Sequence, residues 1–159
     1  MAEYAVVFKI KELVAGNGWL AAVSAQGRAL MAFEDGLWWM YGVQPGGMSV
    51  NGKTAPEAWH NFTLAFKRIL SDHASETVYY ENFAKDLGEF FAQIDEEDLT
   101  RWKQSRNAVR SGTVTPDEPF IGLPKDTSEA LASLETKKID NLPSLKSAYN
   151  DEAEYSAAA

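Results

Sequence analysis

The stretch Asn51-Gly52-Lys53-Thr54-Ala55-Pro56-Glu57-Ala58-Trp59 separates two kinds of sequence pattern. Before it, short apolar runs alternate with turn signals, and after it apolar residues recur at helical spacing. Thr54 and Glu57 have the T-x-x-E spacing of a capping box, in which each side chain accepts a hydrogen bond from the other residue's backbone N–H. Pro56 lies in the first turn, where a missing N–H costs nothing. We therefore predict that a long helix begins here, with Gly52, Thr54 and Glu57 as its structural motif.

The same region also matches a phosphate-binding pattern. Residues Gly47 to Thr54 fit G-x-x-x-x-G-K-[ST], which leaves open a small-ligand or nucleotide site. However, Met48 and Val50 occupy a loop whose amides must wrap around phosphate oxygens, a task that favours small residues. No later apolar strand ends in an Asp that could hold Mg²⁺. The sequence therefore favours the structural interpretation, and we expect no cofactor.

The residues before this stretch are typical of an antiparallel meander. Strand-like runs cover residues 4–13, 19–23, 29–33 and 37–43, and a short one covers 48–50. Turn signals separate them at Ala15 to Gly18, at Gln26-Gly27 and at Asp35-Gly36. Such short connections permit hairpins and exclude parallel crossovers. The fold class predicted is α+β: an antiparallel β-meander packed on one long helix, plus two further helices and an extended C-terminal tail.

The residues after this stretch are predicted to be helical and then irregular. Apolar periodicity predicts helices over 55–73 and 76–94, and a third helix that starts at the acidic residues 95–98 and reaches Arg110. Prolines interrupt residues 113–125, a weak helix is predicted over 127–138, and the polar end from 141 is predicted to be mostly disordered. We expect a sheet-and-helix domain over 1–75, a helical extension over 76–110, and a linker and tail over 111–159.

Composition limits the kinds of partner. The chain has 159 residues, a formal net charge of -8 and no cysteine. Its acidity is unfavourable for binding nucleic acid through the overall field and favours a basic protein partner. The absence of cysteine excludes disulfides and thiolate chemistry, and no long apolar run is present. We expect a cytoplasmic protein.

The sequence gives little sign of catalysis or metal binding. His60 and His73 lie on the same predicted helix, about 20 Å apart at ~1.5 Å per residue, so they cannot share one substrate or metal ion. We predict no catalytic residue and no metal site. Partner-binding candidates come from the aromatic strand and from the acidic face of the second helix: Trp38, Trp39, Glu81, Asp86 and Glu89.

Residues 52–62 carry a resemblance to a known family. Gly52-Lys53-Thr54-Ala55-Pro56-Glu57-Ala58, followed by Asn61, resembles the G-x-T-x-x-E-A-x-x-N segment of HicB-like antitoxins, which joins a strand to one long helix. Val43-Gln44-Pro45-Gly46 is similar to the strand end that precedes it in that family. The resemblance covers mainly residues 37–74. It implies a non-enzymatic protein-binding module, often accompanied by a C-terminal DNA-binding segment that residues 76–110 do not match.

Three functions follow from these observations. The favoured one is a HicB-like protein-binding module, an antitoxin whose partner is a small basic toxin-like protein or a second copy of the chain. The alternatives are a small-ligand or nucleotide-binding protein that uses the loop Gly47 to Thr54, and a nucleic-acid binder that uses the basic helix over 101–110. The acid-to-base order of that helix also fits its macrodipole, which favours a structural interpretation of its arginines.

Overall fold

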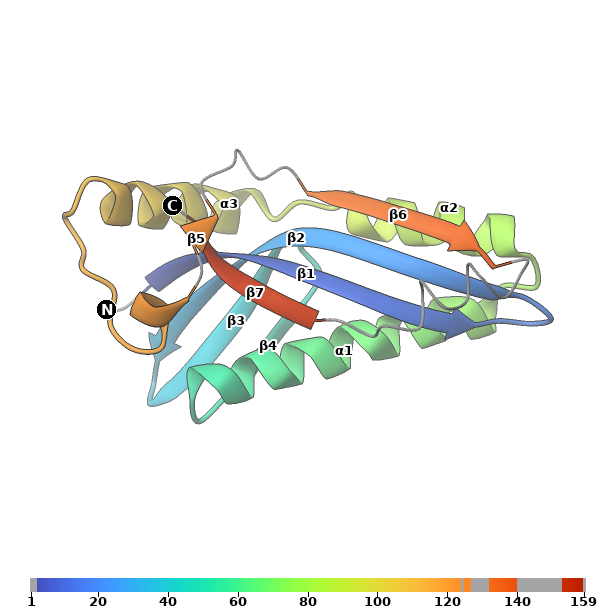
Figure 1. The fold of residues 1–159 in the computed structure, drawn as a ribbon, viewed down its shortest axis with the longest axis horizontal. Coiled ribbons are helices and arrows are strands. Elements are labelled where there is room, and N and C mark those ends of the chain that lie inside the picture. Colours follow the sequence, from blue (N-terminus) through green and yellow to red (C-terminus); the bar gives the residue numbers. More distant parts are fainter. Residues whose placement is uncertain (1–2, 124, 127–131, 140–152, 159) are drawn as a thin grey trace.

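The computed structural model describes residues 3–123, 125–126, 132–139 and 153–158 and has an α+β fold, as predicted (Figure 1). The strands are β1 (Glu3–Ala15), β2 (Leu20–Glu34), β3 (Leu37–Gln44), β4 (Ser49–Gly52), β5 (Lys125–Asp126), β6 (Ser133–Lys138) and β7 (Ala153–Ala158). The helices are α1 (Ala55–Glu76), α2 (Tyr80–Phe91) and α3 (Glu96–Arg110), with a 3₁₀ turn η1 at Phe120–Gly122.

The sheet is built on the predicted meander. Its strand order is β4-β3-β2-β1-β7-β5, and β6 pairs with β2. All pairs are antiparallel except β5 with β7. The long strand β2 pairs along one edge with two strands, because β6 takes residues 21–26 and β3 takes residues 28–34. The β2–β3 hairpin turns at Asp35-Gly36, where both residues have positive φ, as the predicted turn requires.

The turn predicted at Gln26-Gly27 does not form. Strand β2 continues through both residues, and the pairing of β2 with β3 shifts register between Arg28 and Ala29. A Cβ at Gly27 would lie 2.3 Å from the Phe8 ring and 2.6 Å from the Gln44 carbonyl oxygen. The glycine therefore permits close packing within a bent strand and does not mark a chain reversal.

The predictions for the C-terminal part were also wrong where the structure describes it. Residues 133–138 form β6 and not the end of a helix, while residues 127–131 lie outside the described part. Residues 153–158 form β7 and pair with Val6 to Ile10 of β1, although the tail was predicted to be disordered. The physical reason is tertiary: the edges of β2 and β1 supply partners for segments whose own composition is weakly apolar. Residues 140–152 lie outside the described residues.

Helices cover both faces of the sheet. Helices α1 and α2 lie on one face, with buried side chains that include Phe62, Phe66, Phe83 and Leu87. Helix α3 lies on the other face, where Trp102 packs among Ala5, Val7, Leu30 and Val43. Helix α1 runs three residues further than predicted, and α2 is shorter than predicted, because residues 77–79 and 92–95 connect the helices.

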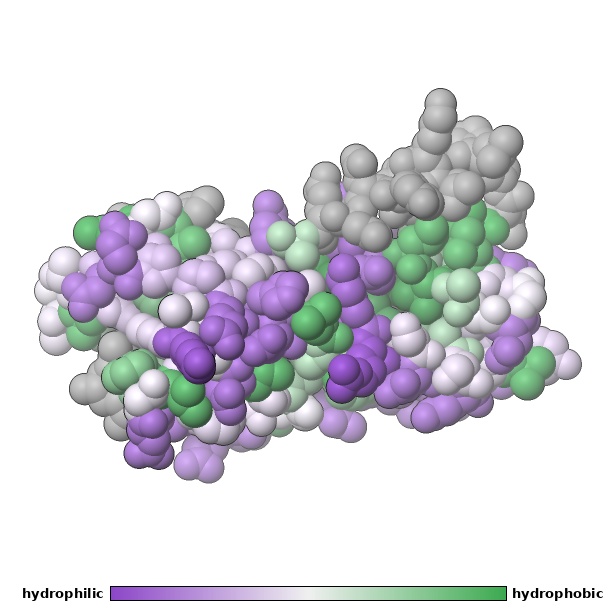
Figure 2. All heavy atoms as spheres, turned by 90° about the horizontal axis from the view of Figure 1, so that it is seen from below, coloured by the Kyte–Doolittle hydropathy of each residue, from purple (hydrophilic) through white to green (hydrophobic). Residues whose placement is uncertain are grey.

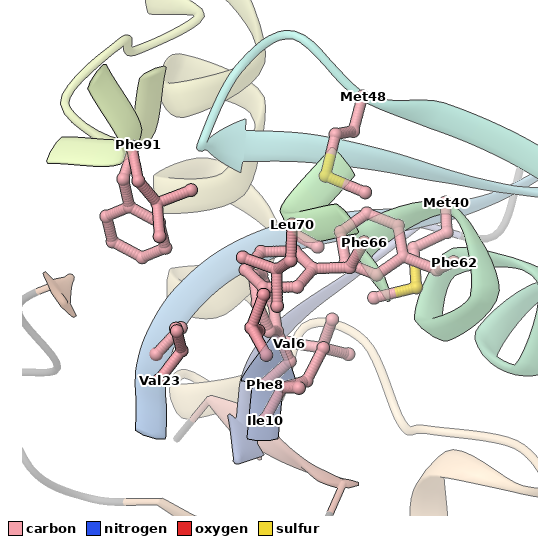
Figure 3. Packing of buried hydrophobic residues seen from close by; sticks show 14 of the residues in the cluster. Val6, Phe8, Ile10, Val23, Met40, Met48, Phe62, Phe66, Leu70 and Phe91 are labelled. Carbon is pink, nitrogen blue, oxygen red and sulfur yellow. The ribbon is translucent and has the colours of Figure 1, made fainter. Parts of the chain in front are cut away.

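The larger core lies between the sheet and the pair α1–α2. Figure 3 shows Val6, Phe8 and Ile10 of β1 meeting Phe62, Phe66 and Leu70 of α1, with Met40 and Met48 beside them. The Phe8 ring meets the Phe62 and Phe66 rings edge-on, at 5.1 and 6.1 Å between centroids. Even-numbered residues of β1 therefore face α1, as strand alternation requires, and odd-numbered ones face α3.

Candidate functional site

The motif around Thr54 forms a joint between strand and helix. The Thr54 hydroxyl accepts a hydrogen bond from the Glu57 N–H at 3.2 Å, and the Asn61 side chain donates to the Asn51 carbonyl of β4 at 2.8 Å. A Cβ at Gly52 would lie 2.6 Å from the Ala58 nitrogen. Of the two hydrogen bonds of the predicted capping box, the described residues make the one to Thr54 only. Gly52, Thr54, Glu57 and Asn61 therefore each help to connect β4 to α1, which is a structural role.

The phosphate-loop pattern falls on a different local structure. Residues 49–52 form β4, which runs antiparallel to β3, and the Met48 carbonyl accepts from the Gly42 N–H at 2.8 Å. The Met48 side chain is buried in the main core, while Lys53 is exposed. A phosphate cradle needs consecutive free amides ahead of a helix that follows a parallel strand. The geometry from Gly47 to Thr54 gives no support to a nucleotide site.

The two tryptophans predicted to bind a partner lie on opposite faces of the sheet. Trp38 faces the α1–α2 side, where its ring lies 5.4 Å from Phe120 and 5.6 Å from Phe33. Trp39 faces the α3 side and stacks on Tyr41, with ring centroids 5.8 Å apart and planes 4° apart. Both tryptophans are half-buried. They cannot contribute to one contact patch on a single face.

The acidic residues of α2 lie on its outer side. Glu81 and Glu89 are exposed and Asp86 is half-buried, while Phe83, Leu87 and Phe91 of the same helix are buried. Helix α2 packs beside α1, so these carboxylates and Trp39 lie on opposite sides of the sheet. The structure therefore places the three acidic residues on one helix, with the exposed Lys85 among them, and separates them from Trp39.

A charge cluster that sequence reasoning missed joins α3 to the sheet. The Arg101 guanidinium pairs with Glu3 of β1, with Glu34 of β2 at 3.2 Å, and with Asp98 at 3.2 Å. The hydrogen bond to Glu3 raises the pKa of Arg101. Burial and the nearby Asp95 raise the pKa of the Asp98 carboxyl, against the effect of Arg101. Arg101 is thus occupied within the protein, so the basic helix over 101–110 presents less free positive charge than its sequence suggests.

Tyr41 and Trp102 extend this face. The Tyr41 hydroxyl donates to Glu34 at 2.9 Å, and burial together with that hydrogen bond raises the pKa of Tyr41 to about 12. The guanidinium groups of Arg28 and Arg106 lie over the Trp102 ring, at 5.5 and 5.0 Å. Burial, with a smaller effect of Arg106, lowers the pKa of Arg28. These contacts hold α3 on the sheet, and no sequence pattern indicated them.

A hollow of about 340 Å³ lies beside this cluster, lined by Tyr41, Gly46, Gly47, Met48, Ser49, Asp95 and Asp98. Both carboxylates are already engaged, because Asp95 caps α3 by accepting from the Asp98 N–H and Asp98 binds Arg101. In the described part of the chain, no group of three His, Cys, Asp or Glu residues has the geometry of a metal site. His60 is exposed, and His73 lies against the Phe90 ring.

Comparisons with protein-family models, with curated proteins and with solved structures found no match. None of the described helices combines the length and the apolar character needed to cross a membrane. The evidence for function is therefore the geometry of the candidate residues described above.

Proposed function

We propose that this chain is a non-enzymatic protein-binding module that acts in the manner of HicB-like antitoxins. Its partner is a small basic toxin-like protein, and the two meet in the cytoplasm. The main support for the proposal is the connection at Gly52, Thr54, Glu57 and Asn61. It joins the last strand of an antiparallel meander, β4, to one long helix, α1. This is the arrangement that the resemblance implies for that segment.

Charge supports the choice of partner. The chain carries 23 acidic and 15 basic residues, and the exposed carboxylates of Glu81 and Glu89 lie on the outer side of α2. Several negative charges on one surface attract a basic protein during its diffusional approach and raise the association rate. Asp86 adds to the same surface. Trp39, half-buried on the opposite face, is a second candidate contact within this proposal.

The proposal predicts that a short basic protein is encoded beside this chain, and that protein provides the test. That protein is expressed alone and together with the chain, and cell growth and complex formation are measured. We expect growth arrest by the basic protein alone, rescue by the chain, and a stable complex in size-exclusion chromatography with light scattering. Absence of a neighbouring basic protein, or a chain that neither binds nor rescues, contradicts the proposal.

A matched pair of charge reversals tests the role of α2. The double variant Glu81→Lys with Glu89→Lys should weaken the complex about tenfold or more, since it replaces attraction with repulsion. The control Asp72→Lys with Glu76→Lys makes the same change of charge at exposed positions near the end of α1. Equal effects of the two double variants would indicate that only net charge matters, and the assignment to α2 would then be wrong.

A further inference from the structure

The turn end of the β2–β3 hairpin carries a partly exposed cluster of aromatic and aliphatic side chains. Phe33 of β2 is 43% exposed and packs 5.6 Å from its cross-strand neighbour Trp38. The Trp38 ring also contacts Phe120 of η1, and the next residue, Ile121, is 55% exposed. Phe33 and Ile121 are among the few large apolar side chains that the described residues leave in water. Exposed apolar side chains beside a half-buried tryptophan are a feature of interaction surfaces.

The cluster rests on a rigid support. Tyr4 of β1 stacks on Phe120 with centroids 4.1 Å apart, and its hydroxyl accepts a hydrogen bond from the Asp117 N–H at 3.3 Å. The Ile121 N–H donates to the Asp117 carbonyl at 3.0 Å. These contacts fix residues 117–121 against the hairpin. A partner that binds here would meet a surface that is already ordered, which lowers the entropy cost of association.

The exposed charges around the cluster are acidic apart from Lys53, which follows Gly52, the strand partner of Trp38. Asp35 lies in the hairpin turn next to Phe33, and Asp117 and Glu118 precede Phe120; all three are exposed. None of the three makes an ion pair among those described. Neither residues 29–52 nor residues 111–123 contain a lysine or arginine. At the left end of Figure 2, the end at which β2 turns into β3 in Figure 1, hydrophobic residues lie among hydrophilic ones.

We propose that this hairpin end is the docking surface for a short segment of a basic partner protein, one that places an apolar side chain between arginines or lysines. The apolar side chain packs against Phe33, Trp38 and Ile121, and the cations lie beside Asp35, Asp117 and Glu118. Charge complementarity selects this occupant, because an acidic or neutral segment would leave the three carboxylates unpaired. The inference rests on the proposed function and specifies which surface of the module anchors the partner.

The test uses the full chain and a synthetic peptide of about ten residues in which arginine alternates with leucine. The control peptide carries glutamate in place of arginine. Binding is followed by the indole N–H signals in nitrogen-15 spectra, with the buried Trp102, whose indole N–H donates to the Val6 carbonyl, as an internal control. We expect the arginine peptide to shift the Trp38 signal, and the glutamate peptide to shift neither signal.

Matched variants locate the contact. The double variant Phe33→Ser with Ile121→Ser should weaken binding of the arginine peptide about tenfold, with only a small decrease in the unfolding midpoint, because about half of each side chain is already exposed. Leu64→Ser, at a side chain of α1 that is 48% exposed, should leave the affinity unchanged.

Shifts confined to Trp39 or to residues 81–89, or equal binding of both peptides, overturn the docking surface. Such results leave the growth-rescue test of the module untouched. If the chain rescues growth and the Phe33→Ser with Ile121→Ser variant rescues it equally well, the docking surface is wrong and the proposed function stands. The two failures are therefore distinguishable.

Discussion

Gly27 shows how a single residue can mislead a prediction from sequence. Its pattern favours a turn, whereas its place in β2 is set by the Phe8 ring and the Gln44 carbonyl oxygen. We predict that Gly27→Ala lowers the free energy of unfolding by about 1–3 kcal/mol, since the added methyl group overpacks the core. Gly88→Ala, in α2 with nothing near its Cβ, should instead raise it by about 0.5–1 kcal/mol. Urea unfolding of both variants measures the difference. Equal values would contradict the packing described at Gly27.

Tyr41 gives a second prediction for a single residue. Its folded pKa of about 12 lies above the ordinary value of 10.0, owing first to burial and then to the hydrogen bond with Glu34. The stability due to this group is therefore fully present below about pH 10 and is lost as the pH rises through the folded pKa. Ultraviolet titration of tyrosinate should show a late component that becomes smaller in Tyr41→Phe and is retained in part by Tyr155, whose pKa burial also raises. A substitution that instead removes signal from the component near the ordinary pKa of 10.0 would mean that Tyr41 is not shielded.

The joint between β4 and α1 is tested as an element. We predict that Thr54→Ala lowers the free energy of unfolding by about 1 kcal/mol, because the Glu57 N–H loses its acceptor. Lys53→Ala, next to it and exposed, should change stability little. Calorimetric titration with ATP and Mg²⁺ should give no binding to either variant or to the unchanged chain. ATP binding that Lys53→Ala abolishes would restore the phosphate-loop hypothesis.

Strand β7 links the C-terminal segment to the first strand. It pairs with Val6 to Ile10, buries Ala158, and places Tyr155 4.8 Å from the Trp59 ring of α1. Truncation after residue 152 should lower the free energy of unfolding by about 2 kcal/mol or more, from the lost apolar burial. Glu154→Gln, at an exposed position of β7, is the control with little expected effect. A truncated chain as stable as the full one would show that β7 contributes nothing to the sheet.

The elements predicted from sequence are those with strong local signals. The capping residue Thr54, the turn at Asp35-Gly36 and the apolar period of α1 each fix a structure within a few residues. Strands β6 and β7 lack such signals, because their conformation depends on edges of β1 and β2 that are distant in sequence. The opposite orientations of Trp38 and Trp39 follow from strand alternation, but which face each helix covers does not.

The contacts around the candidate site residues could be predicted less well from the sequence than the fold. Residue types made Trp38 and the carboxylates of α2 candidates, and these candidates stay predictions. The contact of Trp38 with Phe120 comes from a segment more than 80 residues away that was predicted to be a linker. The pairing of Arg101 with Glu3 and Glu34 joins three elements. Such long-range contacts depend on topology, and local pattern contains no information about them.

At the scale of the whole molecule, both faces of the sheet are covered by helices of the same chain. Helices α1 and α2 cover one face and α3 the other (Figure 1). The two surfaces proposed for a partner are the outer side of α2 and the turn end of the β2–β3 hairpin, and the carboxylates of both are exposed or half-buried. A basic partner that uses them would bind through opposite charge and a small aromatic anchor.

The most direct measurement is the dissociation constant of the complex between this chain and the short basic protein that the proposal predicts to be encoded beside it, at about 50 mM and about 500 mM salt. We predict tight binding at low salt that weakens about tenfold or more at high salt, since exposed carboxylates drive association. Absence of binding at low salt, or an affinity that does not depend on salt, would contradict an acidic module built to bind a basic protein.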